Sequence, residues 1–505
     1  MRIFRSTTVR YGFGYTVFTG SRLLRDMVFA YLLGPEALGV WASLSIYRQY
    51  TAYSDLGLTN GLRRVLPKLL ESRNDRAAQT AAGMAWIGAM ALTTIFSVTL
   101  LVVAACYSDS GGYSYWTGIA ALILMMYLDK HYLYLYVLFQ STRRVSESGL
   151  WMGALGTAEL TTGCLLTWWL GIYGLYISLF VSAAIVCFGM MQRRPLQARL
   201  EFDKSLVKSL GITSLTLMGF GLVNVAIHNV DRVAILWNLG DGVELSHYHI
   251  AALLGIMVGQ APSVLLAVWS PEMFRFGKED RSKLRRFYLL PSAIVASLGA
   301  CTGGVVWLWA PWGLHRFLPA YWPVVNIVGW LVLGEIFFAT TAIAQAVEVA
   351  MDRGFQSLIV RIAAVMAGLA GATWALLTGR GLPGVAATMC LSHFAAWLIV
   401  STMTCSHLQV SFGRYALATL VPVGYCLAIL GMIHQTMNAV HFTSWHVVVA
   451  SGVFLLAFSP LMLLLFLYLD HHSVKRLSGL KRFLYWECNQ TPTSSESSSM
   501  GVANS

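Results

Sequence analysis

Five basic side chains lie inside long apolar segments of the chain: Arg22, Arg25, Arg48, Lys130 and Arg232. A charge at the centre of a bilayer costs about 2.5–3.5 kcal/mol on insertion scales, so such residues must face a cavity or find partners. Guanidinium groups bind phosphate oxygens through paired hydrogen bonds and remain charged at physiological pH. The five residues therefore predict a binding site for an anion such as a phosphate group.

Local pairing is the alternative interpretation for two of the arginines. Arg22 and Asp26 are four residues apart, so they lie on one face of a helix and could neutralise each other. That pair would leave Arg25 without a local partner. Arg48 has no carboxylate one turn away, which favours a position facing a cavity.

The other two cations have alternatives of their own. Lys130 could form a bridge between helices with Glu159. Arg232 follows Asp231, so these two residues could form an ion pair that holds the fold together. Both alternatives stay open at this point, because side chains on neighbouring helices cannot be placed from one sequence.

Carboxylates share the same apolar segments. They are Asp26, Asp55, Asp129, Glu159, Asp231, Glu335 and Glu348. We expect Asp55 and Glu348 to be solvated, because they fall towards the ends of their segments. Asp26, Glu159, Asp231 and Glu335 are candidate sites for a coupling ion, H⁺ or Na⁺, since a buried carboxylate favours protonation or a cation. The alternative is that each pairs with a cation on another helix.

The elements that carry these residues are membrane-spanning helices. The 505 residues are 57% hydrophobic and 11% charged, whereas soluble domains are about 25% charged. A span needs roughly 20 mostly apolar residues. By that rule the sequence predicts fourteen spans, at about 12–34, 37–60, 79–106, 115–138, 149–170, 172–191, 209–238, 246–269, 288–310, 324–349, 357–378, 383–405, 414–434 and 446–469.

The distribution of Lys and Arg predicts the orientation. With both termini cytoplasmic, 28 of the 35 basic residues fall in cytoplasmic segments, among them Arg353 and Arg361 before the eleventh span. Only Arg316 and Arg380 fall in outer loops. This asymmetry follows the positive-inside rule. It also assigns the net charge of +12 to membrane topology, so we expect no nucleic-acid partner.

A weak internal repeat predicts two lobes. Gly34 precedes Pro67 by 33 residues, and Gly240 precedes Pro271 by 31, with a basic loop after each. Repeats in transporters meet at the substrate site. We expect an all-α integral membrane protein of about 14 helices, in two six-helix lobes plus two C-terminal helices. The predicted boundaries are 1–194 for the N-lobe, 195–208 for a basic linker, 209–405 for the C-lobe, 406–470 for the last two helices, and 471–505 for a cytoplasmic tail with a disordered end.

Short motifs resemble a known family. Two runs are similar to the oligosaccharide flippases, namely LLGPEALGVW at 32–41 and DLGLTNGLRR at 55–64. These are the Wzx-type polysaccharide transporters of the multidrug/oligosaccharidyl-lipid/polysaccharide exporter superfamily. Asp231-Arg232 and the run YHIAA at 248–252 resemble the family's aspartate-arginine and tyrosine-x-x-alanine pattern. His249 and the Arg22/Arg25 pair are not general family features, so the substrate's identity does not follow from the resemblance.

The resemblance implies a function. It is an alternating-access flippase that moves a lipid-pyrophosphate-linked oligosaccharide (an O-antigen or exopolysaccharide repeat unit) from the cytoplasmic to the outer leaflet. It implies the bacterial cell inner membrane, membrane lipids as surroundings and polysaccharide-assembly machinery as a candidate partner. The alternatives are a peptidoglycan lipid-precursor flippase, a multidrug exporter of the same fold, and a membrane glycan ligase or polymerase.

No motif for catalysis appears. The sequence has no Walker A pattern, and its eight cysteines are scattered without a CxxC pair or a histidine cluster. We therefore expect a transporter and not an enzyme, with no catalytic residue, no metal and no cofactor.

Overall fold

The computed structural model describes residues 7–106, 113–201, 203–279, 281–437 and 444–471. Within these ranges the chain is all-helical and contains no strand, which confirms the predicted fold class. The elements are α1 Thr7–Thr51, α2 Leu58–Glu71, α3 Asp75–Cys106, α4 Tyr113–Ser141, α5 Val145–Leu170, α6 Ile172–Gln192, α7 Lys204–Leu239, α8 Val243–Glu279, α9 Arg281–Phe317, η3 Pro319–Val324 (a 3₁₀ helix), α10 Val325–Ala350, α11 Gly354–Leu377, α12 Gly381–Leu408, α13 Phe412–Met437 and α14 Ser444–His471. The predicted tail after 471 lies outside the described residues.

Helix α1 contains two of the predicted spans. Its backbone leaves the helical conformation at Gly34, where φ is 71°, and Pro35 begins the second half. Glycine adopts a positive φ at little cost, and proline is favoured at the first position of a helix. Among the described residues, ten helices are long and apolar enough to cross a membrane, counting α1 once. The chain is therefore a multi-pass membrane protein.

The predicted span at 37–60 is wrong at its C-terminal end. The helix stops at Thr51, residues 52–57 form turns, and α2 follows as a separate helix. Leu56 and Gly57 have positive φ values of 49° and 76°, which no continuous α-helix accommodates. The Asp55 carboxylate accepts hydrogen bonds from the backbone N–H groups of Gly57 and Thr59, both at 3.1 Å, and so caps the new helix.

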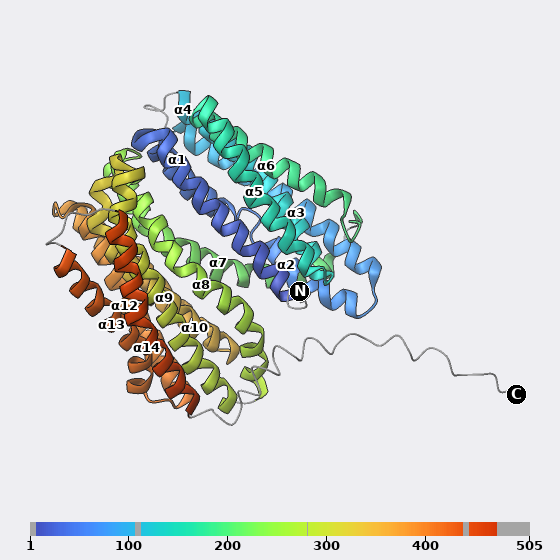
Figure 1. The fold of residues 1–505 in the computed structure, drawn as a ribbon. Coiled ribbons are helices and arrows are strands. Elements are labelled where there is room, and N and C mark those ends of the chain that lie inside the picture. Colours follow the sequence, from blue (N-terminus) through green and yellow to red (C-terminus); the bar gives the residue numbers. More distant parts are fainter. Residues whose placement is uncertain (1–6, 107–112, 202, 280, 438–443, 472–505) are drawn as a thin grey trace, which may run out of the picture.

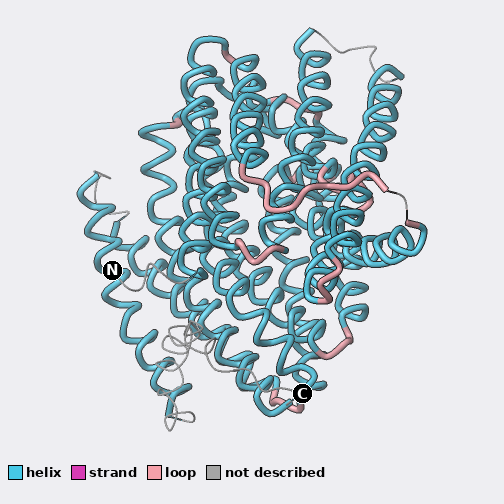
Figure 2. The backbone as a smooth tube through the Cα atoms, turned by 90° about the vertical axis from the view of Figure 1, so that its right-hand side faces the viewer, coloured by secondary structure: helices cyan, strands magenta, loops and turns pink. Residues whose placement is uncertain are grey.

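The helices form two groups, as Figure 1 shows. Helices α1 to α6 lie together in the first bundle, and α7 to α14 lie together in the second bundle. In the second bundle α10 packs against α8, α9 and α12, while α13 and α14 pack on α9. Contacts between the bundles run along a seam formed by α1 and α2 on one side and by α7 and α8 on the other. Figure 2 shows these helices joined mostly by short loops, with one longer connection before α7.

Glycines allow α1 and α5 to pack very closely. A Cβ atom at Gly14 would lie 1.9 Å from the carbonyl oxygen of Gly149, and one at Gly156 would lie 2.6 Å from Cα of Phe18. The two helices run parallel, because successive positions of one meet successive positions of the other. Small residues at helix contacts are typical of membrane proteins, where close packing replaces the hydrophobic driving force.

We predict that Gly156→Val destabilises the first bundle by about 1–3 kcal/mol, because the added side chain overlaps the α1 backbone. The measurement is thermal unfolding of the purified protein in detergent. Gly431→Val on α13 is the matched control, since no atom lies within 4 Å of a Cβ added there. Equal melting temperatures for the two variants would contradict this account of the packing.

Candidate functional site

Two of the predicted cations, Arg22 and Arg25, meet Glu159 in the first bundle. Arg22 donates from Nε and Nη2 to the two Glu159 carboxylate oxygens at 2.8 and 2.7 Å. Arg25 donates from Nη1 to the same carboxylate, and from Nε and Nη2 to Asp26 at 2.9 and 2.7 Å. Arg22 thus pairs with α5 and not with Asp26, and Arg25 does have partners.

Arg48 joins this cluster from the second half of α1. Its Nε and Nη2 groups donate to the Asp129 carboxylate of α4 at 2.9 and 3.0 Å. Arg22 and Arg48 lie within electrostatic range of each other. We call Arg22, Arg25, Arg48, Asp26, Asp129 and Glu159 the arginine cluster. The Arg22 side chain is 34% exposed and that of Asp129 36%, so the cluster borders an accessible surface.

Lys130 lies apart from the arginine cluster. Its ammonium group donates to Asp55 Oδ1 at 2.8 Å and to the Ala52 carbonyl oxygen, and both charged side chains are 2% exposed. The alternative pairing with Glu159 is therefore wrong. The expectation that Asp55 is solvated is also wrong, because the carboxylate is enclosed by its helix cap and Lys130. Glu348 is likewise fully buried and pairs with His407 at 3.0 Å.

Arg232 lies across the seam, on α7. Its Nη2 group donates to the His228 carbonyl oxygen at 2.6 Å, and Nη1 lies 3.4 Å from His249 Nδ1. Asp231 accepts the Arg232 backbone N–H at 2.8 Å and the Tyr248 hydroxyl at 2.9 Å. The suggested Asp231–Arg232 side-chain ion pair is absent among the described residues. Instead the two short motifs, at 231–232 and 248–252, join through Tyr248 and His249.

Polar contacts connect the two sides of the seam. Asn229 on α7 donates to the Gln49 side-chain oxygen of α1 at 2.9 Å. His249 lies within electrostatic range of Arg25, and Tyr50 lies within range of Arg232. The arginine cluster and Arg232 therefore lie on opposite faces of one polar seam between the bundles.

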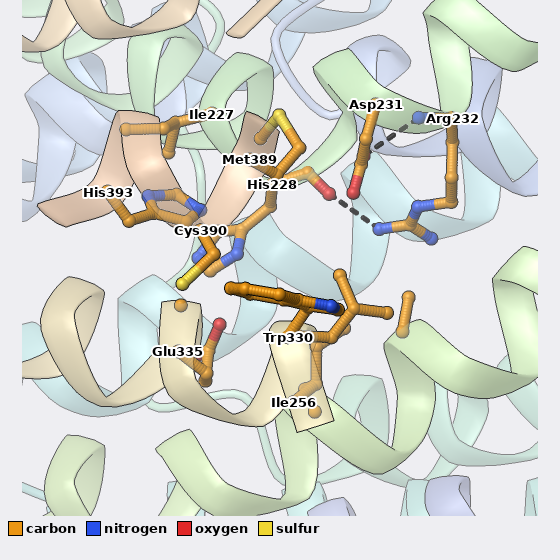
Figure 3. Close-up of a pocket in the computed structure, with 14 residues that line it drawn as sticks. Ile227, His228, Asp231, Arg232, Ile256, Trp330, Glu335, Met389, Cys390 and His393 are labelled. Carbon is orange, nitrogen blue, oxygen red and sulfur yellow. Dashed lines mark hydrogen bonds between the residues drawn. The ribbon is translucent and has the colours of Figure 1, made fainter. Parts of the chain in front are cut away.

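A small polar cavity lies behind Arg232 in the second bundle. Its volume is about 40 Å³, and α7, α8, α10 and α12 line it. At 10–15 Å³ per molecule, this is room for about three waters. Figure 3 shows the Glu335 carboxyl group pointing towards the wall that carries His228, His393 and Cys390. Arg232 Nε and His393 Nδ1 are buried and have no hydrogen-bond partner among the described residues. We call this cavity the Glu335 chamber.

Sequence reasoning missed several residues of this region. Arg361 was assigned to a cytoplasmic loop, but it is buried in α11 and donates to Gln345 on α10 and Asn224 on α7 at 2.5 and 3.3 Å. Its guanidinium group lies 5.1 Å from the Phe338 ring centroid. The sequence does contain a signal that Arg361 is buried in the membrane region, since position 361 falls inside the predicted span at 357–378. His228 and His393 carried no such signal, because a lone histidine in an apolar helix has no distinctive pattern.

A larger apolar cavity lies on the far side of α10. It measures about 480 Å³ and is enclosed by α9, α10 and α13. Trp330 lines both this cavity and the Glu335 chamber. Apart from Trp330, the lining of the larger cavity is almost entirely hydrophobic, so this cavity offers no charged group for an anion.

The seam brings together groups that can bind a charged species. Within the described ranges, no three His, Cys, Asp or Glu side chains cluster closely enough to hold a metal ion. The seam offers arginines held in place by carboxylates on one face. On the other face it offers an arginine, imidazoles and a carboxyl group that lines a polar cavity. These groups can bind charged species.

Comparison with known proteins identifies the fold. No family model and no curated protein matches the sequence. Among solved structures, the chain is similar to an inward-facing multidrug resistance MATE family transporter of the MOP superfamily, with a TM-score of 0.66 and 14% identity over 78% of this chain and 94% of the other. An outward-facing structure of such a transporter gives 0.55 and 14% over 80% and 95%. A MOP superfamily transporter from Pyrococcus furiosus, described as having a binding pocket of reverse polarity that suggests a different function, gives 0.54 and 15% over 81% and 97%. The chain has a MATE-like transporter fold.

We predict that Glu159→Gln costs about 3–5 kcal/mol of stability, because it removes the buried carboxylate that the buried Arg25 and the partly exposed Arg22 share. The measurement is the free energy of unfolding from a denaturing-detergent titration in mixed micelles. Glu147→Gln is the matched control on the same helix: its pair with Arg144 is exposed and 3.9 Å long, so its loss should cost less than about 1 kcal/mol. Similar losses in both variants would refute the central place of Glu159.

Proposed function

We propose that this MATE-like transporter is an alternating-access flippase for a lipid-pyrophosphate-linked oligosaccharide. The polar head group enters the seam between the two bundles, while the lipid tail remains in the bilayer. Rocking of one bundle against the other then exposes the glycan on the opposite side, as in transporters built from repeats. In this proposal the lobes predicted at 1–194 and 209–405 are the two moving bodies.

One observation carries the proposal. Arg22 and Arg48 each use Nε and Nη2 for a carboxylate, and neither Nη1 group has a partner among the described residues. Their carboxylates fix the two guanidinium planes, so little ordering remains when an anion binds. A pyrophosphate offers several oxygens, and charge-assisted hydrogen bonds to Nη1 are the stronger kind. Arg22 is accessible enough to make the first contact.

The remaining predicted cations take different parts in this proposal. Arg25 is nearly buried and holds Glu159 and Asp26, so we assign it to supporting the cluster. Arg232, with Nε unpartnered, is a second contact for the head group on the opposite face of the seam. Lys130 is fully engaged with Asp55 and Ala52, and we do not include it in the head-group site.

We propose Glu335 as the coupling carboxyl group. Of the four candidates, Asp26 and Glu159 belong to ion pairs, and Asp231 accepts two hydrogen bonds. Glu335 faces the polar chamber and has no hydrogen bond or ion pair within the described part of the chain. Its charge can therefore be balanced by H⁺ or Na⁺ without disturbing a structural contact.

The proposed setting follows the charge distribution. Arg63, Arg64, Lys68, Arg143 and Arg193 lie at one end of the first bundle, which we take as the cytoplasmic end by the positive-inside rule. We propose the bacterial cell inner membrane, with both termini cytoplasmic. A saccharide-assembling system would supply the substrate and accept the product.

We predict that Arg48→Gln combined with Asp129→Asn slows flipping at least tenfold. The double change removes a phosphate donor without leaving a buried charge, and one charged hydrogen bond is worth about 1.5–3 kcal/mol. The assay follows a labelled lipid-pyrophosphate saccharide in proteoliposomes, with Arg76→Gln plus Glu201→Gln, an exposed pair, as the control. Wild-type flipping by the first variant, or equal transport of a phosphate-free glycolipid, would remove the anion site. Export of a cationic dye alone would support the drug-exporter alternative.

We predict that Glu335→Gln abolishes the dependence of the flipping rate on an imposed H⁺ or Na⁺ gradient, because a neutral amide cannot exchange charge with the chamber. The gradients are imposed one at a time on proteoliposomes. Glu244→Gln, an exposed carboxyl group at the start of α8, is the control and should keep the dependence. A Glu335→Gln protein that still responds to either gradient would place the coupling elsewhere.

A further inference from the structure

The break at residues 52–57 distinguishes the two halves of the internal repeat. The second half of α1 followed by α2 covers residues 35–71, whereas its counterpart α8 runs from Val243 to Glu279 as one continuous helix. The break therefore has no equivalent in the second bundle. It exposes the carbonyl end of one helix and the N–H end of the next, and both must be satisfied within the protein.

The Lys130–Asp55 ion pair satisfies both ends of the break. Lys130 donates to the Ala52 carbonyl oxygen just after α1 ends, where the helix dipole favours a positive charge. Asp55 accepts the Gly57 and Thr59 N–H groups and the Thr59 hydroxyl at 2.6 Å, where the dipole favours a negative charge. The same two side chains then bind each other at 2.8 Å. One buried pair on α4 and the 52–57 turn thus fixes the direction in which α2 leaves α1.

Helix α2 makes a close contact across the seam. A Cβ atom at Gly61 would lie 2.1 Å from Ser214 Oγ on α7, and one at Gly57 would lie 2.8 Å from the Ser214 carbonyl oxygen. At the other end of the seam, a Cβ atom at Gly39 would lie 2.3 Å from the carbonyl oxygen of Asp241. Each end of the seam therefore has a close contact between the bundles at a glycine, where an added Cβ atom would overlap the opposite bundle.

We propose that Lys130 is a positioning residue for a gate at the basic end of the seam. Through Asp55 it seats α2 against Ser214, and release of α2 opens that end between the bundles. Gly39 and the α7–α8 turn form the corresponding contact at the opposite end. This assignment gives Lys130 a role other than contact with the head group, and it depends on the fold and not on the identity of the substrate.

The test measures the accessibility of each end separately. Ser214→Cys reports on the basic end and Ser246→Cys, at the start of α8, on the opposite end, since both serines are buried in the parent. Each is labelled with a membrane-impermeant maleimide in sealed vesicles of both orientations. Exposed Arg64→Cys identifies the basic face, and the parent protein gives the background from native cysteines. In the Lys130→Met background we expect Ser214→Cys labelling to rise at least fivefold, while Ser246→Cys labelling stays unchanged or falls. Gly61→Ala should give the same pattern without touching the ion pair.

The controls separate a gate from general loosening. Gly39→Ala should raise labelling of Ser246→Cys and not of Ser214→Cys, and Lys130→Arg should stay near the parent because it keeps the charge. Arg76→Gln breaks an exposed pair at the same end and should change neither rate. Unchanged Ser214→Cys labelling in both Lys130→Met and Gly61→Ala would overturn the proposal. A simultaneous rise at both ends would also overturn it, because that result describes unfolding.

Discussion

The cost of holding a charge in a bilayer governs how this protein is built. A charged group deep in the membrane-spanning region needs a partner or a polar cavity. The described structure satisfies this constraint with pairs that join different helices: Arg22 to Glu159, Arg48 to Asp129 and Lys130 to Asp55. The three pairs tie both halves of α1 and the turn that follows it to α4 and α5. The charged residues are therefore part of the framework of the first bundle as well as candidates for contact with a ligand.

The two bundles meet the constraint differently. In the first bundle the arginines of the cluster are paired with carboxylates. The donors without a partner among the described residues are the Nη1 groups of Arg22 and Arg48. In the second bundle Arg232 and Arg361 rest on carbonyl, amide and aromatic groups, without a carboxylate partner among the described residues. Glu335, which could neutralise a cation, instead lines a small polar chamber. The arginines on the first-bundle face of the seam are thus balanced by carboxylates. The charged groups on the second-bundle face have no such partners and can still bind an ion.

The sequence alone predicts most of the helices, but it does not predict which charged residues form ion pairs between helices. Apolar segment length predicts spans well because a bilayer allows little else, and Gly34 followed by Pro35 marks the turn inside α1. The break at 52–57 was missed because the local cap by Asp55 is completed by Lys130 on α4, a residue 75 positions away from Asp55. Glu159 was named as a candidate ion site, but its two arginine partners could not be chosen from spacing alone. His228 and His393 became candidates only when α7 and α12 were placed around Glu335.

The balance of charge in the arginine cluster has an electrical consequence. Three guanidinium groups and three carboxylates sum to zero in their ordinary ionisation states. Displacing one elementary charge through the membrane voltage is worth about 2.3 kcal/mol per 100 mV, and a neutral cluster carried with its helices escapes that work. The voltage then acts on whatever the seam carries, so a dianionic cargo would be driven outward by a potential that is negative inside. The arginine cluster itself would then contribute little to the transport current of such a protein.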